Sequence, residues 1–397
     1  MAQDVSPGKE AKVKMDQMGR RLRMGMVGGG AGSFIGPVHR MAAELDGTIE
    51  LVAGAFSQDA ARSRQAGVTY GVSPDRAYTN YEEMMERESK REDAIDFVCI
   101  VTPNHLHLPI AAAALEHGFH VMSDKPATAT LDEAQTLAGI VRRTGLLYGL
   151  TFTYTGYPLV REARLMARGG ALGKIRKAVV QYSQGWLSTS LETTGHKQAA
   201  WRSDPARSGL GGAIGDIGVH AFNLLEYVSG REVAEICADL NKVVAGRSLD
   251  DDCNVLLKLD NGAPGVLFVS QIAAGDRNDL QLHLYGEKGG LHWCQENPNY
   301  LDVNWIGQPS QTLHAAGDYL APSVRADFRL PMGHPEGLLE AFANIYRDFA
   351  TAVRARFSDP TAQLSELVPG IHEGLRSMTF VERAVTSSRT RAGWVSL

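Results

Sequence analysis

Apolar runs alternate with stretches of helical periodicity along the first third of the chain. Short apolar runs, which are typical of strands buried in a sheet, fall at residues 22–27, 49–56, 94–101, 119–122 and 146–151. Helical patterns lie between and after them at residues 37–44, 59–66, 80–85, 107–117 and 130–145. Asn80 and Thr130 are suited to cap two of these helices. The alternation predicts a parallel, doubly wound sheet of the Rossmann type.

The pattern changes in the second half, where strand follows strand with few helices. Strands are predicted at residues 175–184, 233–244, 254–259, 265–272 and 280–285, and helical patterns return at 335–354 and 365–387. Asn261-Gly262 is a hairpin turn signal between two of the strands. This half therefore predicts an α+β domain with a large, mainly antiparallel sheet.

These patterns predict an α/β chain in three parts. Residues 1–20 are polar and predict a flexible arm, residues 21–152 a dinucleotide-binding Rossmann domain, and residues 153–397 a domain for substrate binding and oligomerisation. An antiparallel sheet often covers one face with helices and leaves the other open. We expect that open face to form the interface of a homodimer or homotetramer.

A glycine-rich turn joins the first predicted strand to the first predicted helix. Gly28, Gly30 and Gly32 allow a backbone to approach a pyrophosphate, and the helix N-terminus offers free N–H groups. The usual fingerprint has two residues between its second and third glycines, whereas five separate Gly30 from Gly36. Either Gly32 supplies the missing role or the loop is longer. A plain glycine turn is the alternative, but the surrounding βα alternation favours a cofactor cradle.

The end of the second predicted strand bears on the choice between NAD and NADP. An acidic residue usually stands there to bind the ribose of NAD, but the sequence is Phe56-Ser57-Gln58-Asp59. Ser57 and Arg62 can instead hold a 2′-phosphate, since a guanidinium matches phosphate oxygens. The cofactor is therefore expected to be NAD or NADP, with NADP narrowly favoured; a solvated Arg62 is the alternative.

Two polar loops close neighbouring parallel strands at the edge where ligands bind. They are Thr102-Pro103-Asn104-His105-Leu106-His107 and Ser123-Asp124-Lys125-Pro126. Lys125 can reach the nicotinamide end of a cofactor from this edge, although a solvated lysine and structural loop histidines are the alternatives. The predicted cofactor-binding residues are Gly28, Gly30, Gly32, Ser33, Phe34, Ser57, Arg62, Thr102, Pro103, Asn104, His107, Asp124 and Lys125.

The second half contains one dense group of chemically active residues. Asp216 and His220 lie four positions apart at the start of a predicted helix, so they share a face. A carboxylate beside a histidine aims the ring and suits it to act as a general base. A capping aspartate with a core histidine is one alternative; a metal pair is another, but no third ligand has suitable spacing and no metal is predicted. Aromatic and polar residues suited to a hydroxyl-rich ligand are Tyr154, Tyr157, Trp201, Arg202 and His220.

Composition narrows the class of protein. Apolar residues make up 44% and charged residues 21% of the chain, and the net charge is −5 with both signs interspersed. This balance is typical of a globular protein and argues against nucleic acid or a membrane surface as a partner. The four cysteines are scattered without CxxC spacing, which indicates reduced thiols in a cytoplasmic protein.

Taken together, these motifs resemble the Gfo/Idh/MocA family of sugar and cyclitol oxidoreductases over about residues 21–390. The resemblance rests on GMVGGGAGSFIGPVHR, VTPNHLH, SDKP and GGAIGDIGVH, in that order. The family's usual Glu-Lys-Pro is here Asp124-Lys125-Pro126, and Asp216 and His220 match its Asp-x-x-x-His pair. The resemblance implies that the cofactor lies over the glycine loop and that Lys125 and His220 approach the reacting hydroxyl.

The resulting hypothesis is hydride transfer between a nicotinamide and a secondary alcohol or ketone of a sugar, glycoside or cyclitol. His220 takes the hydroxyl proton, Asp216 orients His220, and Lys125 stabilises the alkoxide character; these three are the predicted catalytic residues. Three alternatives stay open: redox-assisted glycoside cleavage with bound NAD, a non-catalytic sensor of nucleotide or sugar, and a metal-dependent dehydrogenase.

Overall fold

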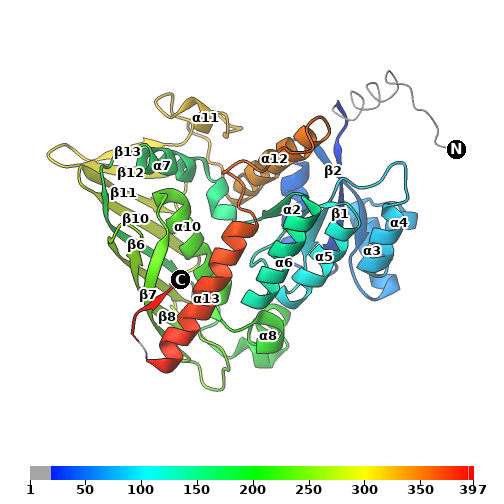
Figure 1. Cartoon of the computed structure of the whole chain (residues 1–397), viewed down its shortest axis with the longest axis horizontal. Coiled ribbons are helices and arrows are strands. Elements are labelled where there is room, and N and C mark those ends of the chain that lie inside the picture. The colour runs from blue at the N-terminus through cyan, green and yellow to red at the C-terminus, as the bar shows by residue number, and fades with distance from the viewer. Residues whose placement is uncertain (1–18, 392) are drawn as a thin grey trace.

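Two sheets with helices between them make up the part of the chain described by the computed structural model (Figure 1). The structure describes residues 19–391 and 393–397, so the predicted flexible arm lies, but for its last two residues, outside the described residues. A five-stranded sheet belongs to the N-terminal part and a nine-stranded sheet to the C-terminal part.

The first sheet is parallel and doubly wound, as predicted. Its strands, in the spatial order β2-β1-β3-β4-β5, are β1 Leu22–Gly28, β2 Ile49–Ala55, β3 Phe97–Val101, β4 His120–Ser123 and β5 Tyr148–Leu150. The helices are α2 Ile35–Glu44, α3 Ala60–Tyr70, α4 Tyr81–Glu88, α5 His107–Glu116 and α6 Leu131–Thr144. Every residue of β3 is buried, as expected for a strand covered on both faces.

The caps predicted for two helices are present. The Asn80 side chain accepts a hydrogen bond from the Glu83 N–H at the start of α4. Thr130 and Glu133 form a capping box at the start of α6, each side chain accepting from the other's backbone N–H. Gly145 ends α6 in the left-handed conformation that glycine adopts without strain.

The second sheet is mainly antiparallel and larger than predicted. Its strands, in the order β13-β12-β11-β10-β6-β9-β8-β7-β14, are β6 Ile175–Ser183, β7 Val233–Asn241, β8 Asp252–Leu259, β9 Pro264–Ser270, β10 Asp279–Gly286, β11 Gly289–Cys294, β12 Tyr300–Trp305, β13 Gln311–His314 and β14 Val395–Ser396. In this sheet β6 and β9 pair in parallel, and the other neighbours are antiparallel. The prediction missed the last four strands because β11 opens with two glycines, β13 is mostly exposed and β14 has only two residues.

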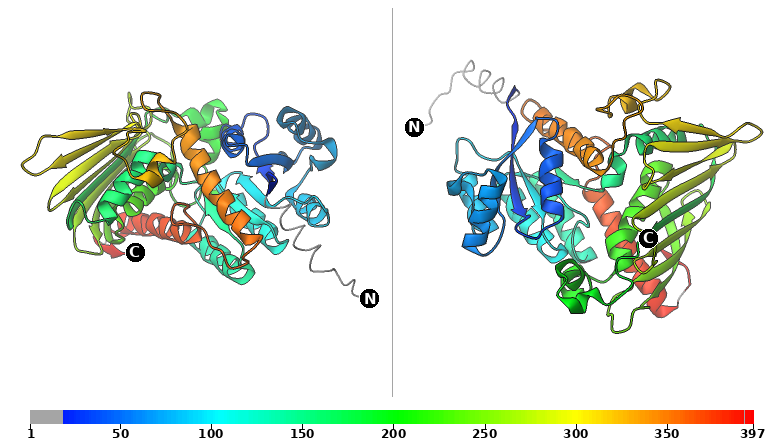
Figure 2. Two further views of the ribbon diagram at one scale, coloured as in Figure 1. Left: turned by 90° about the horizontal axis from the view of Figure 1, so that it is seen from above. Right: turned by 180° about the vertical axis from the view of Figure 1, so that it is seen from behind.

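Helices cover one face of the nine-stranded sheet. The α-helices of the second half of the chain are α7 Pro158–Arg168, α8 Lys197–Arg202, α9 Pro205–Ser208, α10 Val219–Ser229, α11 Pro322–Arg325, α12 Leu338–Arg356 and α13 Ile371–Thr390. Figure 2 shows α10 and α13 on the inner side of this sheet, toward the first sheet, while its other face is turned outward. The predicted α/β fold class, with a Rossmann sheet and an α+β part, is thus confirmed.

The late helix α12 packs against the N-terminal sheet. Phe342, Tyr346 and Phe349 of α12 share one apolar cluster with Met24 and Phe97 of the first sheet. Nothing in the sequence indicated this return of the chain, and the predicted domain boundary at residues 152/153 stays a prediction.

A buried polar group fixes α12 against α2. The Tyr346 hydroxyl lies 2.7 Å from Nδ1 of His39 and 3.1 Å from Sγ of Cys99. Burial lowers the pKa of His39 to about 4 and raises the pKa of the Cys99 thiol to about 12, so both groups are neutral at pH 7. The cluster is therefore structural, and the thiol is not activated.

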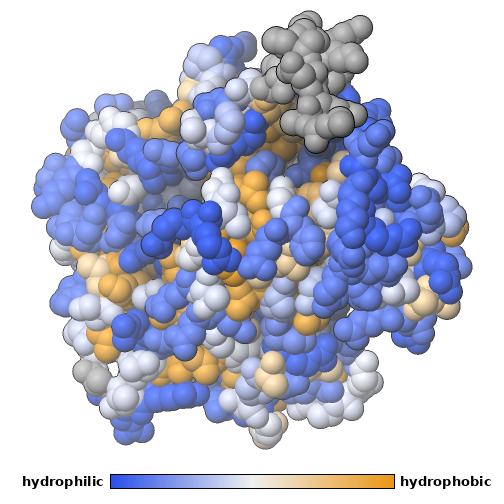
Figure 3. Space-filling view, turned by 45° about the vertical axis from the view of Figure 1, so that its right-hand side comes forward, coloured by the Kyte–Doolittle hydropathy of each residue, from blue (hydrophilic) through white to orange (hydrophobic). Residues whose placement is uncertain are grey.

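The surface seen in Figure 3 is mostly hydrophilic, with smaller hydrophobic areas near its middle. Among the described helices, none combines the length and the apolar composition needed to cross a bilayer.

Candidate active site

Several glycines of the loop after β1 pack so closely against neighbouring atoms that a side chain would not fit there. Gly28 and Gly29 have φ angles of 94° and 77°. A Cβ on Gly30 would lie 2.5 Å from the Phe56 carbonyl oxygen, and one on Gly36 would lie 2.4 Å from Cα of Gly29. Gly36 thus permits the close approach of α2 to the loop that the third glycine of a dinucleotide fingerprint provides. Of the two possibilities left by the sequence, the longer loop is the one observed.

The additional residues of this loop precede α2, which begins at Ile35. Oγ of Ser33 accepts a hydrogen bond from the Gly36 N–H, and the side chain of Phe34 is 67% exposed. The hydroxyl of Tyr70, the last residue of α3, donates a hydrogen bond to the Gly29 carbonyl and so helps to fix the loop. Gly32 has a φ of 77° and open space around it. The predicted cofactor residues of the loop therefore surround one helix N-terminus.

The segment between β2 and α3 contains one acidic residue, Asp59, which lies directly before α3. The Asp59 carboxylate caps α3 by accepting from the Arg62 N–H, and Oγ of Ser57 accepts from the Asp59 N–H. No acidic residue stands directly at the end of β2, as the sequence indicated; Asp59 lies four residues after Ala55 and caps α3.

Some predicted residues of the loop after β3 form hydrogen bonds within the protein, and others have polar atoms without a partner among the described residues. His107 is almost fully buried, with its ring nitrogens 2.7 and 2.8 Å from the carbonyls of Pro126 and Thr102. Asn104 donates from its amide to the Ser208 carbonyl across to α9. The ring nitrogens of His107 and the amide NH2 of Asn104 are engaged with the protein and tie the loop to its neighbours, and the predicted contacts of both residues with a cofactor stay predictions. Oγ1 of Thr102 and Nδ1 of His105 are buried without a hydrogen-bond partner among the described residues.

Lys125 reaches across to the second half of the chain. Nζ of Lys125 donates to the Asp216 backbone carbonyl at 2.6 Å and to Oδ1 of Asp216 at 2.9 Å. Both side chains are about seven-eighths buried, with 13% and 14% exposed. The turn that presents Lys125 is held by Asp124, whose Oδ1 accepts from the Lys125 N–H and from the Thr151 hydroxyl. Asp124, predicted to touch the cofactor, therefore fixes the lysine.

Asp216 is the centre of a group of hydrogen-bond donors. Its Oδ2 accepts from Nε of Arg202 at 3.0 Å and from Nε2 of Gln271 at 2.9 Å, while Oδ1 is bonded to Lys125. Burial by itself raises the pKa of Asp216, but the two cations Lys125 and Arg202 more than offset it and hold the pKa well below its usual range. Asp216 is therefore ionised at pH 7.

The structure corrects the expected pairing of Asp216 with His220. No hydrogen bond joins these two side chains in the described residues; the carboxylate oxygens of Asp216 accept instead from Lys125, Arg202 and Gln271. Two of these three bonds are assisted by a full positive charge, which makes them stronger than a bond from a neutral imidazole. Asp216 therefore orients Lys125 rather than His220.

The His220 imidazole is surrounded by aromatic side chains. Phe152, Tyr154 and Tyr182 surround its imidazole with ring centroids 5.7, 4.9 and 6.3 Å away, the first two edge to face. Nδ1 of His220 has no partner among the described residues. Burial lowers the pKa of His220 well below its usual value, Lys125 acts in the same direction, and Asp216 acts against them. His220 is therefore a neutral imidazole with unused hydrogen-bonding capacity.

The predicted substrate residues fall into two places. Tyr154 lies beside His220, with its hydroxyl bonded to that of Tyr182 and to the Asn278 amide. Tyr157 lies deeper, 3% exposed, with its ring between Tyr154 and Trp293. The Tyr157 ring packs against other aromatic side chains in the core, and its predicted contact with a substrate stays a prediction.

Trp201 and Arg202 come together at the end of α8. The Arg202 guanidinium lies 4.3 Å from the centroid of the Trp201 ring, and both side chains donate to Oε1 of Gln198. Arg202 thus stands against Asp216, at the edge of the site.

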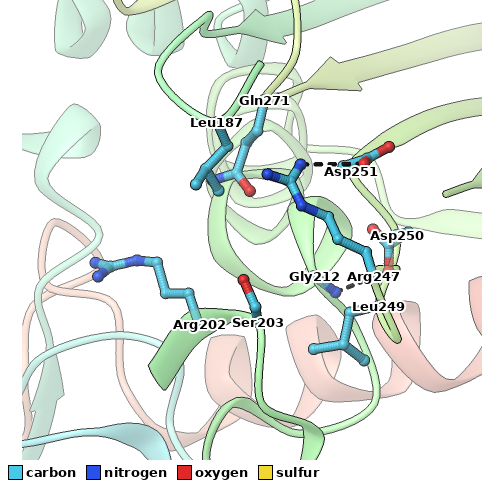
Figure 4. Close-up of a pocket in the computed structure, with 9 residues that line it drawn as sticks. All are labelled: Leu187, Arg202, Ser203, Gly212, Arg247, Leu249, Asp250, Asp251 and Gln271. Atoms are coloured by element: carbon cyan, nitrogen blue, oxygen red, sulfur yellow. Dashed lines mark hydrogen bonds and ion pairs between the residues drawn. The ribbon is translucent and has the colours of Figure 1, made fainter. Parts of the chain in front are cut away.

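The turn that carries Asp216 is itself fixed by a buried carboxylate. Residues Ile214–Gly218 form a π turn before α10, and Asp250 accepts from the N–H groups of Gly212 and Ile214 ahead of it. Figure 4 shows Asp250 beside Gly212 in a small pocket, with the Arg202 guanidinium turned away from that of Arg247. Arg247 is bonded to Asp251 and Glu192, so it is structural.

Gln271 and Asp250 were missed because their positions depend on the long-range topology. Gln271 directly follows β9, whose parallel pairing with β6 no local pattern revealed. Asp250 lies 34 residues beyond Asp216 along the chain, and only its place in a run of three acidic residues marked it out. In the described residues, no three histidine, cysteine or acidic side chains are grouped so that they could hold a metal ion.

Comparison with known proteins gives consistent matches over most of the chain. Residues 22–152 match the model of an oxidoreductase family with an NAD-binding Rossmann fold, and residues 160–292 match the GFO/IDH/MocA C-terminal domain. An uncharacterized oxidoreductase of Bacillus subtilis, YfiI, is 36% identical over 94% of this chain and 96% of its own.

Two solved structures of an inositol dehydrogenase homolog from Azotobacter vinelandii are also similar. The complex with NAD⁺ is 37% identical, with a TM-score of 0.91 over 96% of this chain and 98% of that one. The complex with NADH and myo-inositol is 36% identical, with a TM-score of 0.88 over 96% and 99%.

The glycine loop fits a dinucleotide because three features coincide there. The backbone at Gly30 and Gly36 packs too closely to admit a Cβ while Gly32 has open space around it, the N-terminus of α2 follows the loop, and Thr102 and His105 in the loop after β3 carry buried polar atoms without partners among the described residues. The predicted contacts of individual residues with the cofactor stay predictions.

The substitution Gly36→Ala is expected to weaken NAD binding at least about tenfold, because its Cβ would push α2 away from Gly29. Titration of NADH by fluorescence measures the effect. Gly139→Ala, on the surface of α6 with no atom within 4 Å, is the matched control and leaves the affinity unchanged. An unchanged affinity of the Gly36 variant would contradict the proposed role of this contact.

Proposed function

The chain belongs to the Gfo/Idh/MocA family of NAD-binding oxidoreductases, and on this premise we propose that it transfers a hydride between nicotinamide and a secondary hydroxyl of a cyclitol or sugar. The observation that carries the proposal is the junction of Lys125, Asp216 and His220 at the carboxyl edge of the parallel strands. The substrate class is supported by the aromatic and polar wall around His220 and by the myo-inositol complex of the Azotobacter relative.

In the proposed reaction, His220 and Lys125 act on the same hydroxyl oxygen. His220 is neutral at pH 7, so it accepts the hydroxyl proton on its imidazole nitrogen. Lys125 donates a hydrogen bond to the oxygen and stabilises its developing negative charge. When bound, the nicotinamide supplies the acceptor for the hydride. Asp216 keeps Lys125 in place, which revises the role expected for it from the sequence.

The proposal is tested by following nicotinamide absorbance while a panel of inositols, aldoses and glycosides is added. We expect Lys125→Ala and His220→Ala each to lower kcat by about 10²- to 10⁴-fold, because each removes one contact with the reacting oxygen. Both variants should still bind NADH. Lys242→Ala, an exposed lysine distant in sequence from both, is the control for lysine removal.

The outcomes of the panel are distinguishable. Near-normal turnover in either variant would remove that residue from the mechanism. Cleavage of a glycoside without net cofactor reduction would favour redox-assisted cleavage, and cofactor binding without any reaction would favour the sensor hypothesis. Loss of activity with a chelator would favour a metal-dependent dehydrogenase.

For the cofactor we propose NAD, in place of the narrow preference for NADP inferred from the sequence. The Asp59 carboxylate stands at the start of α3, where the 2′-phosphate of NADP would bring further negative charge. The NAD⁺ and NADH complexes of the Azotobacter relative support the same choice.

We expect kcat/KM to be higher with NAD than with NADP by on the order of tenfold or more. Asp59→Asn should narrow this ratio, because it removes the charge that repels a 2′-phosphate. Glu82→Gln, in the first turn of α4, changes the same charge elsewhere and serves as the control. A preference for NADP in the unmodified protein would overturn the proposal.

We further propose that the outward face of the nine-stranded sheet binds a second copy of the chain. Val179, Val266 and Phe268 lie partly exposed on this face, and Leu256 and Tyr285 are 51% and 45% exposed. These neighbouring apolar side chains form a surface of the kind that protein interfaces cover. The predicted cytoplasmic location remains a prediction.

Light scattering is expected to give the mass of two or four chains. Val266→Lys should shift the protein toward the monomer, because it places a charge between Val179 and Leu256, its neighbours on the adjacent strands of the apolar face. Lys258→Gln, on the same sheet but beside Glu235, is the control. A monomeric unmodified protein would exclude the interface.

A further inference from the structure

Arg202 approaches the reaction centre from a separate element. It is the last residue of α8, whereas Lys125 follows β4 and Asp216 lies in the turn before α10. The Arg202 Nε–Oδ2 distance of 3.0 Å matches the Lys125 Nζ–Oδ1 distance of 2.9 Å. The two cations therefore hold opposite oxygens of one carboxylate.

The guanidinium of Arg202 is engaged on several sides. Its Nη1 donates to Oε1 of Gln198 at 2.7 Å, and its plane lies against Trp201 at 4.3 Å and Trp186 at 6.0 Å. The side chain is 24% exposed. Such fixed geometry suits a group that holds another side chain, whereas the sequence had assigned Arg202 to substrate binding.

The charges of Asp216, Lys125 and Arg202 do not sum to zero. Asp216 contributes one negative charge, and Lys125 and Arg202 contribute two positive charges, while Gln271 adds a neutral donor. Without Arg202, Lys125 alone would balance Asp216, and its ammonium would be less able to stabilise an alkoxide. With Arg202 present, one positive charge remains for the substrate oxygen.

We infer that Arg202 is a positioning residue for the reaction: it holds one oxygen of Asp216 while Lys125 holds the other, so that the group of the three side chains keeps a net positive charge beside the substrate hydroxyl. This inference rests on the proposed function. The titratable groups around His220 are Lys125, Asp216, Tyr154 and Tyr182, and those around Asp216 are Lys125, Arg202, His220, Tyr154 and Tyr182.

The pH profile of kcat/KM separates this role from a merely structural one. In the unmodified enzyme the acid limb should lie below pH 6.5, because the neutral form of His220 persists to lower pH than in a free histidine. Arg202→Gln removes a cation from the cluster, so protonation of the base becomes easier and the acid limb moves up by about one pH unit. The kcat falls at neutral pH, and KM changes little.

Two variants provide the comparison. Arg202→Lys keeps the charge but loses the planar fork, so it should restore most of the position of the acid limb and only part of kcat. Lys197→Gln removes one charge from the exposed start of the same helix and should leave the profile in place. A raised KM with an unmoved acid limb would show that Arg202 binds substrate instead, and an unchanged enzyme would show that it has no role; either result overturns the inference.

A second measurement does not depend on turnover, so it separates failure of this inference from failure of the proposed function. Urea unfolding midpoints are compared for Lys125→Met, Arg202→Gln and the double variant. Each single variant leaves Asp216 one cation, but the double variant leaves a buried carboxylate with none. The double variant should therefore lose more than the sum of the two single losses. Strictly additive losses would overturn the inference even if the enzyme proves active on the panel.

Discussion

A buried carboxylate must be balanced by cations, and the site of this protein is organised by that requirement at Asp216. Removing the partner of a buried charge typically costs about 3–5 kcal/mol, so a single carboxylate can hold distant segments together. Asp216 does so for the turn after β4, the end of α8 and the residue that follows β9. The same bonds that stabilise the anion therefore place Lys125 beside His220, which joins the stability of the fold to the geometry of the reaction.

The sequence was sufficient for those parts of the site that follow from local rules. Parallel strands bring their carboxyl ends to one edge, so the sequence alone places the loops after β3 and β4 together. The glycine loop, the caps at Asn80 and Thr130 and the helix after Asp216 are likewise encoded within a few residues. Local chemistry of this kind is read from spacing because its partners are near in the chain.

What the sequence did not indicate depends on partners that are far apart. Helical spacing placed Asp216 with His220, but the carboxylate turned to Lys125 and Arg202, because charged donors compete better than a neutral ring for a buried anion. Gly36 took the role considered for Gly32 because α2 approaches Gly29 directly. Tyr157 and His107 carried suitable chemistry, yet packing enclosed both of them. Spacing therefore identified candidate groups, and tertiary competition decided their roles.

The return of α12 to the first sheet has a consequence for how the protein is made. Strand β1 leaves the ribosome early, but Phe342, Tyr346 and Phe349, which cover its sheet, are translated more than 300 residues later. The apolar surface of the first sheet that α12 covers therefore stays exposed until the chain is nearly complete. Because a long loop must close, the final docking of α12 on this sheet is slow. Truncation near the C-terminus would damage the cofactor domain at the opposite end of the chain, and a helper that shields this surface during synthesis would raise the yield of folded protein.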